Sequence, residues 1–106
     1  MSENNRITLL LQFVDENPDD AFTKYLLALE YIKEGDDTTA RSWLENVFND
    51  HSDYLPNYYH YGRLLERTGD KDTAARIYRQ GMSLARNQKD VHTYSELQGA
   101  LEQLEE

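Results

Sequence analysis

Three histidines and a surplus of carboxylates are the side chains of this sequence best suited to acid–base or metal chemistry. The chain has 106 residues, with no cysteine and with 20 Asp and Glu against 11 Lys and Arg. His51 stands in the run Asp50-His51-Ser52-Asp53, whose residue types could build a catalytic triad or a metal site. We interpret this run instead as a short turn between helices, because Asp and Ser are ordinary turn and cap residues. His60 and His92 stand in no catalytic spacing.

The acidic pair Asp70-x-Asp72 is the next candidate for a ligand site. It lacks the further ligands and the central glycine of a calcium loop, so it is better interpreted as a helix cap followed by a first-turn acid. The sequence contains no phosphate-binding loop, no H-E-x-x-H and no G-x-G-x-x-G. We therefore expect no catalytic residue, no metal site and no cofactor, and predict that the protein is not an enzyme.

Charge and hydropathy limit the partners. The net charge of -9 at pH 7 argues against binding to nucleic acid or to an anionic membrane, both of which are bound by basic surfaces. The longest apolar run, 7–14, is too short to span a bilayer, which takes about 20 residues. It leads into an acidic segment and not into a signal-peptide cleavage site. These features predict a cytoplasmic protein without membrane association.

The elements that position these side chains are predicted to be helices. Apolar residues recur three and four apart in four segments, and no segment alternates with period two for long. A glycine able to cap a helix C-terminus is followed by an aspartate able to cap the next helix at Gly35-Asp36 and Gly69-Asp70. The four apolar stripes begin at Ile7, Ala40, Ala74 and Tyr94.

These features repeat with a constant interval. Four pairs of identical residues are separated by the same distance along the chain: Gly35 and Gly69, Asp36 and Asp70, Thr39 and Thr73, and Ala40 and Ala74. Four identities in one register indicate an internal repeat, and the interval is that of the tetratricopeptide repeat, a helix-turn-helix unit of about 34 residues. The first repeat reads Lys24-x2-Leu27-Ala28-x2-Tyr31 and then Ala40-x3-Leu44. The second reads Tyr58-x2-Tyr61-Gly62-x2-Leu65 and then Ala74-x3-Tyr78.

On these motifs the chain resembles the tetratricopeptide repeat (TPR) family, in particular its short bacterial members with two repeats. It departs from the family pattern at Lys24, which stands in place of tryptophan, and at Ser52 and Arg86, which stand in place of the closing proline. The resemblance implies an all-α fold, a TPR-like α-solenoid of antiparallel helix pairs with about six helices. We expect a single domain over 1–106, comprising a half-repeat helix (3–16), repeat 1 (21–54), repeat 2 (55–88) and a C-terminal capping helix (90–106).

The resemblance also implies a binding surface. In this family the first helix of each pair lines a concave groove, with repeat positions 2, 5, 9, 12 and 13 facing it. The residues at these positions are Phe22, Tyr25, Leu29, Ile32 and Lys33 in repeat 1, and Pro56, Tyr59, Arg63, Glu66 and Arg67 in repeat 2. The apolar and aromatic groups could bury a side chain of a partner, and the arginines could pair with a carboxylate. We expect another protein or peptide as partner, with a carboxylate or an acidic segment.

An alternative interpretation stays open at this point. The apolar residues of the first helix could instead pack on the N-terminal helix or on a second copy, which would make the protein a self-associating structural module, a homodimer. Chaperone-tail binding is not implied, because the Lys and Asn clamp of that group is replaced here by Tyr25 and Leu29.

Overall fold

The structure is a computed structural model that describes residues 4–106, and these residues form six α-helices and no strands. The helices are α1 (Asn5–Glu16), α2 (Ala21–Lys33), α3 (Asp37–Asp50), α4 (Pro56–Arg67), α5 (Lys71–Asn87) and α6 (Val91–Leu104). The predicted all-α class and the number of helices are thus confirmed. Of the half-repeat helix predicted over 3–16, residue 3 lies outside the described residues, and α1 begins at Asn5.

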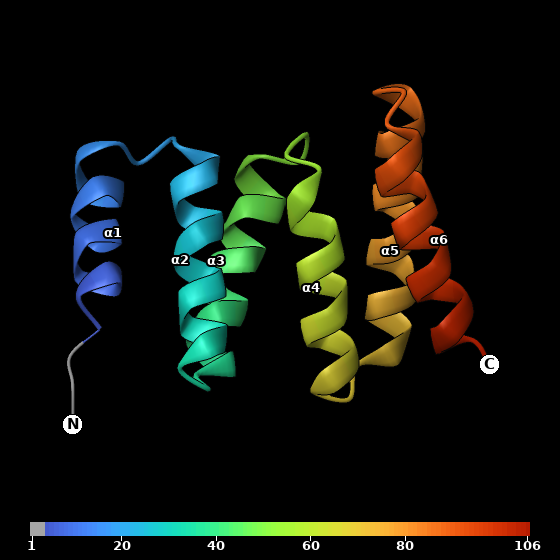
Figure 1. Cartoon of the computed structure of the whole chain (residues 1–106), viewed down its shortest axis with the longest axis horizontal. Helices are drawn as coiled ribbons and strands as arrows, with labels where there is room; N and C mark the ends of the chain where they lie inside the picture. Colours follow the sequence, from blue (N-terminus) through green and yellow to red (C-terminus); the bar gives the residue numbers. More distant parts are fainter. Residues whose placement is uncertain (1–3) are drawn as a thin grey trace. The chain divides into compact units, whose positions relative to one another are not determined.

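The chain divides into two compact units. The first, Met1–His51, contains α1 to α3, and the second, Ser52–Glu106, contains α4 to α6. Within each unit, successive helices run in opposite directions (Figure 1). In the first unit α2 packs against both α1 and α3; in the second, α5 packs against both α4 and α6. Neighbours in sequence are therefore neighbours in space, as in helical repeat proteins.

Local capping explains where most of the helices begin and end. Asp36, Asp70 and Asp90 each accept a hydrogen bond from the backbone N–H three residues later, which satisfies one free donor at the start of α3, α5 and α6. Gly35 and Gly69 adopt φ of 81° and 96°, the left-handed conformation that ends α2 and α4. The caps at Gly35-Asp36 and Gly69-Asp70 were predicted from the sequence. Helix α4 begins with proline at its first position.

The core of the first unit lies between α2 and α3. Leu27 and Ala28 of α2, and Ala40 and Leu44 of α3, are fully buried. The small side chains of Ala28 and Ala40 allow the two helices to approach closely.

Glu30 is a buried carboxylate that ties α1 to α2. Its Oε1 lies 2.8 Å from Nε of Arg6 and 3.7 Å from Nζ of Lys33, and its Oε2 lies 3.4 Å from Nδ2 of Asn4. A buried charge needs such partners, because its desolvation would otherwise cost several kcal/mol. No sequence pattern marks Glu30 as a buried residue.

The core of the second unit is dominated by tyrosines and leucines. Tyr78 of α5 is fully buried against Gly62 of α4, and its hydroxyl donates a 2.7 Å hydrogen bond to Glu66. Burial, together with this carboxylate, raises the pKa of Tyr78 far above its usual value, so the hydroxyl keeps its proton. One turn later on α5, Gly81 lies against Tyr58 of α4 and Leu97 of α6, which brings α6 into contact with the core.

Lys89 is the one described residue other than glycine with a positive φ, 60°. It ends α5 in a Schellman-type turn, in which Asp90 N donates to Ala85 O over 2.9 Å. A side chain in this conformation costs about 1–2 kcal/mol, whereas glycine adopts it freely but loses more conformational entropy on folding, roughly 0.5–1 kcal/mol.

Replacing Lys89 with glycine is therefore expected to stabilise the protein slightly. We expect Lys89→Gly to raise the free energy of unfolding by about 0.5–1 kcal/mol in urea denaturation. Lys89→Ala is the matched control, since it removes the same ammonium group and keeps the backbone strain. Equal stability of the two variants would show that the conformation of residue 89 carries no cost.

Candidate functional site

The candidate site in the second unit centres on Arg63, an exposed residue of α4. Its guanidinium carbon lies 5.9 Å from the centroid of the Tyr59 ring, one turn earlier, in a cation–π arrangement. Within residues 4–106, no carboxylate lies within ion-pair distance of this guanidinium. The guanidinium of Arg63 thus lies over the ring of Tyr59, and its hydrogen-bond donors are available to a ligand.

Two shallow hollows meet at Arg63. The first, of about 230 Å³, lies between α4 and α6, and its lining is Tyr59, Arg63, Glu96, Gly99, Ala100 and Gln103. The second, of about 280 Å³, lies at the end of α4, and its lining is Arg63, Glu66, Arg67 and Lys71. One side of Arg63 is therefore bordered by an aromatic ring, two small residues and the polar Glu96 and Gln103, and the other side by two cations and Glu66.

The charges around the second hollow are predominantly positive. Arg63, Arg67 and Lys71 contribute three cations, and Glu66 contributes one carboxylate, which already accepts the hydroxyl of Tyr78. A carboxylate entering this hollow would meet guanidinium groups able to donate two parallel hydrogen bonds.

His60 lies beside Tyr59, with the two rings 5.5 Å apart in an edge-to-face arrangement. Burial lowers the pKa of His60, while the charge of Glu96 on α6 acts in the opposite direction. The imidazole is therefore predominantly neutral at pH 7 and packs as an aromatic group.

The predicted site residues fall into two sets. The first set lies on α4 and consists of Tyr59, Arg63, Glu66 and Arg67. Pro56 is exposed at the start of the same helix. In the first unit the other set lies on α2, where Phe22 and Lys33 are exposed and the remaining three are half-buried: Tyr25, Leu29 and Ile32. Their spacing along α2 keeps them on one face of that helix.

Sequence reasoning missed the contribution of α6 to the first hollow. A shift of one repeat from Tyr59 and Arg63 leads to Thr93 and Leu97, but Leu97 is fully buried against Gly81. The turn between α5 and α6 spans only 88–90, whereas the turn between α3 and α4 spans 51–55. The connection that sets the orientation of α6 is therefore shorter than the one that precedes α4. The lining residues of α6 therefore do not follow the repeat register.

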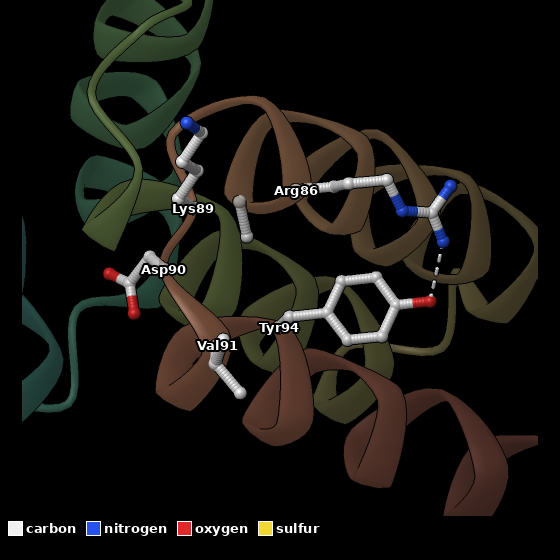
Figure 2. Close-up of a pocket in the computed structure, with 6 residues that line it drawn as sticks. Arg86, Lys89, Asp90, Val91 and Tyr94 are labelled. Atoms are coloured by element: carbon white, nitrogen blue, oxygen red, sulfur yellow. Dashed lines mark hydrogen bonds between the residues drawn. The ribbon is translucent and has the colours of Figure 1, made fainter.

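A third hollow, of about 400 Å³, lies at the turn between α5 and α6 (Figure 2). The Arg86 guanidinium donates a 2.9 Å hydrogen bond to the hydroxyl of Tyr94 and lies 5.2 Å from the centroid of its ring. Hydrogen bonds from the backbone and the hydroxyl of Thr93 lower the pKa of Asp90, which caps α6. The Lys89 ammonium points away from the Arg86 and Tyr94 pair (Figure 2). The polar groups here serve the turn and do not converge on one point.

Among residues 4–106, no cluster of three or more His, Asp or Glu side chains could hold a metal ion. No helix of this part of the chain is long and apolar enough to cross a membrane.

Comparison with solved structures decides the family. A tetratricopeptide repeat domain protein of Salinibacter ruber, solved by crystallography, is 37% identical, and the match covers 81% of this chain and 96% of that one with a TM-score of 0.78. This chain belongs to the tetratricopeptide repeat family. A tetratricopeptide repeat family model matches residues 55–88. The solution structure of the Salinibacter ruber domain superposes similarly, at 37% identity, a TM-score of 0.80, and coverage of 84% of this chain and 90% of that one.

A protein from Bordetella parapertussis has the same fold, with a TM-score of 0.79 and 20% identity over 98% of this chain and 89% of its own. A search of curated protein sequences finds no match. TPR domains are in general protein-protein interaction modules without catalytic activity.

Proposed function

We propose that this TPR protein is a non-catalytic interaction module that binds a segment of a partner protein, an extended peptide or a helix, in a concave groove. On α4 and α6 the groove is formed by the two hollows that meet at Arg63. The observation that carries the proposal is the Arg63 guanidinium, which stacks over Tyr59, is exposed, and has no carboxylate within ion-pair distance among residues 4–106.

The chemistry of the two hollows suggests which ligand groups they accept. Gly99 and Ala100 leave room beside the Tyr59 ring for an apolar side chain of the partner. Arg63, Arg67 and Lys71 offer donors to a carboxylate, either an acidic side chain or a C-terminus. A ligand with an apolar residue next to a carboxylate would satisfy both hollows, because both share Arg63.

The residues of α2 are proposed to contribute apolar contacts to partner binding. Phe22 is 53% exposed, and its helix face continues through Tyr25, Leu29 and Ile32 to the exposed Lys33. Exposed aromatic groups of this kind often anchor protein interfaces.

Arg63→Glu is expected to weaken ligand binding about tenfold or more, equivalent to ~1.4 kcal/mol, because it replaces attraction of a carboxylate with repulsion. Peptides would first be selected with the wild-type protein from a random display library. Their Kd would then be measured by fluorescence anisotropy at several salt concentrations. The loss should shrink as salt rises, since exposed charge pairs are screened over about 8 Å at physiological ionic strength.

Arg76→Glu is the matched control for this experiment. Arg76 is exposed on α5 and lines neither hollow, so the variant makes the same change of net charge away from the groove. Equal losses of affinity in the two variants would indicate a general charge effect and argue against the groove.

A further inference from the structure

The outer face of α1, defined by Leu9 and Phe13, is an exposed apolar surface of the first unit. Leu9 is 55% exposed and Phe13 is 54% exposed, and they lie four residues apart on the same side of the helix. No residue of α1 is buried, and in the first unit α1 packs mainly against α2 (Figure 1). Two large apolar side chains on this face of α1 are thus left in water.

Two opposite charges flank this apolar pair on the same stripe. Arg6, Leu9, Phe13 and Glu16 are spaced three, four and three residues apart, so all four project to one side of α1. The Arg6 side chain is 67% exposed although its Nε contacts Glu30, so its terminal nitrogens can reach a second carboxylate. Glu16 is exposed at the other end of the helix.

The pattern of charged and apolar side chains at these four positions is complementary to the same pattern on a second, antiparallel copy of the helix. The midpoint of positions 9 and 13 coincides with the midpoint of positions 6 and 16, at residue 11. A two-fold axis through this point would bring Leu9 opposite Phe13 of a second copy and Arg6 opposite Glu16 of that copy. A parallel arrangement would instead bring each charge opposite a like charge, which is unfavourable.

We propose that the outer face of α1 is a self-association surface, on which α1 of a second copy of this chain packs in antiparallel orientation about a two-fold axis. This surface differs from the groove of the proposed function and shares no residue with it. Each interface of this kind is isologous, with the apolar pair at its centre and the two ion pairs at its ends.

The dimer is expected to be weak. A 12-residue helix is about 18 Å long, so the paired helices bury less than the roughly 1,200 Å² of a standard stable interface. We expect dissociation constants of tens of micromolar or weaker.

Sedimentation equilibrium of the full chain at concentrations up to about 1 mM tests the proposal. The wild-type protein should show a monomer–dimer equilibrium. Phe13→Glu should raise the Kd of the dimer about tenfold or more, because the substitution buries two charges at the centre of the interface. Val91→Glu is the control, since Val91 is 77% exposed and lies on α6. A wild-type chain that stays monomeric, or a dimer that Phe13→Glu leaves unchanged, overturns the proposal.

A second pair of variants tests the antiparallel orientation. Glu16→Arg places two arginines opposite each other at both ends of the interface and should weaken the dimer severalfold to about tenfold. Asp15→Arg makes the same charge change one residue away, about 100° around the helix, and should weaken it much less. Equal effects of the two variants overturn the antiparallel pairing.

The proposed dimer and the proposed peptide-binding groove can be refuted independently of each other in these experiments. Arg63→Glu changes no residue of α1, so it should leave the dimer Kd unchanged, and Phe13→Glu should leave peptide binding unchanged. Circular dichroism of each variant checks that its helices are intact, which is expected because both side chains are exposed.

Discussion

Gly62→Ala is expected to lower the free energy of unfolding by about 2–3 kcal/mol. A Cβ atom at this position would lie 2.7 Å from Cδ1 and 2.8 Å from Cζ of Tyr78, well inside van der Waals contact. The Tyr78 ring has no room to move aside, because it is fully buried and its hydroxyl is held by Glu66. The gain in helix propensity from alanine, about 1 kcal/mol, offsets only part of this overpacking.

Gly99→Ala provides the matched control, because it is the same substitution in a helix of the same unit. No atom lies within 4 Å of a Cβ built at Gly99, so only the helix propensity changes. This variant is expected to gain about 0.5–1 kcal/mol. Thermal unfolding followed by circular dichroism should then show midpoints that move in opposite directions. A Gly62→Ala midpoint at or above that of wild type would contradict the close packing of α4 on α5.

The parts of the fold that could be predicted from the sequence depend on local chemistry. The left-handed glycines at 35 and 69 and the capping aspartates at 36 and 70 were predicted, because a cap involves residues only three to six positions apart. The close approach at Gly62 falls at a position of the repeat pattern where the paired helices are in contact.

The features that were missed depend on contacts between residues distant in sequence. Glu30 of α2 is held by Arg6 of the preceding helix, and no periodicity marks either residue. Lys24 is buried where the family pattern has tryptophan, and the identity of the residue alone would favour exposure. The long aliphatic stem of a lysine allows this burial.

The candidate site was predictable to a similar extent. The repeat register led to Tyr59, Arg63 and Arg67, which lie on α4 around the two hollows. It did not lead to Gly99 and Ala100, because the three-residue turn before α6 changes the face that this helix presents. The stacking of Arg63 on Tyr59 is a matter of rotamers, which a repeat pattern does not specify.

Leu97→Ala is expected to destabilise the protein by about 2–5 kcal/mol, because α6 supplies the side chains that cover one side of α5. Leu97 is fully buried and reaches Gly81, and Ala100 and Leu101 are buried beside it on α6. Arg79 of α5 and Glu105, just beyond α6, add an exposed ion pair that contributes little by comparison. Gln98→Ala, at the neighbouring exposed position, is the control and should be nearly silent.

Deletion of residues 90–106 extends this test from one side chain to the whole helix. Without α6, the side of α5 at Gly81, which Leu97 covers, would face water, as happens when an end cap is removed from a helical repeat array. We expect the shortened chain to aggregate or to unfold without a cooperative transition, measured by light scattering and by circular dichroism on heating. A shortened chain that stays monomeric and melts at the wild-type temperature would show that α6 is dispensable for folding, and that its packing against Gly81 adds nothing to the stability of the second unit.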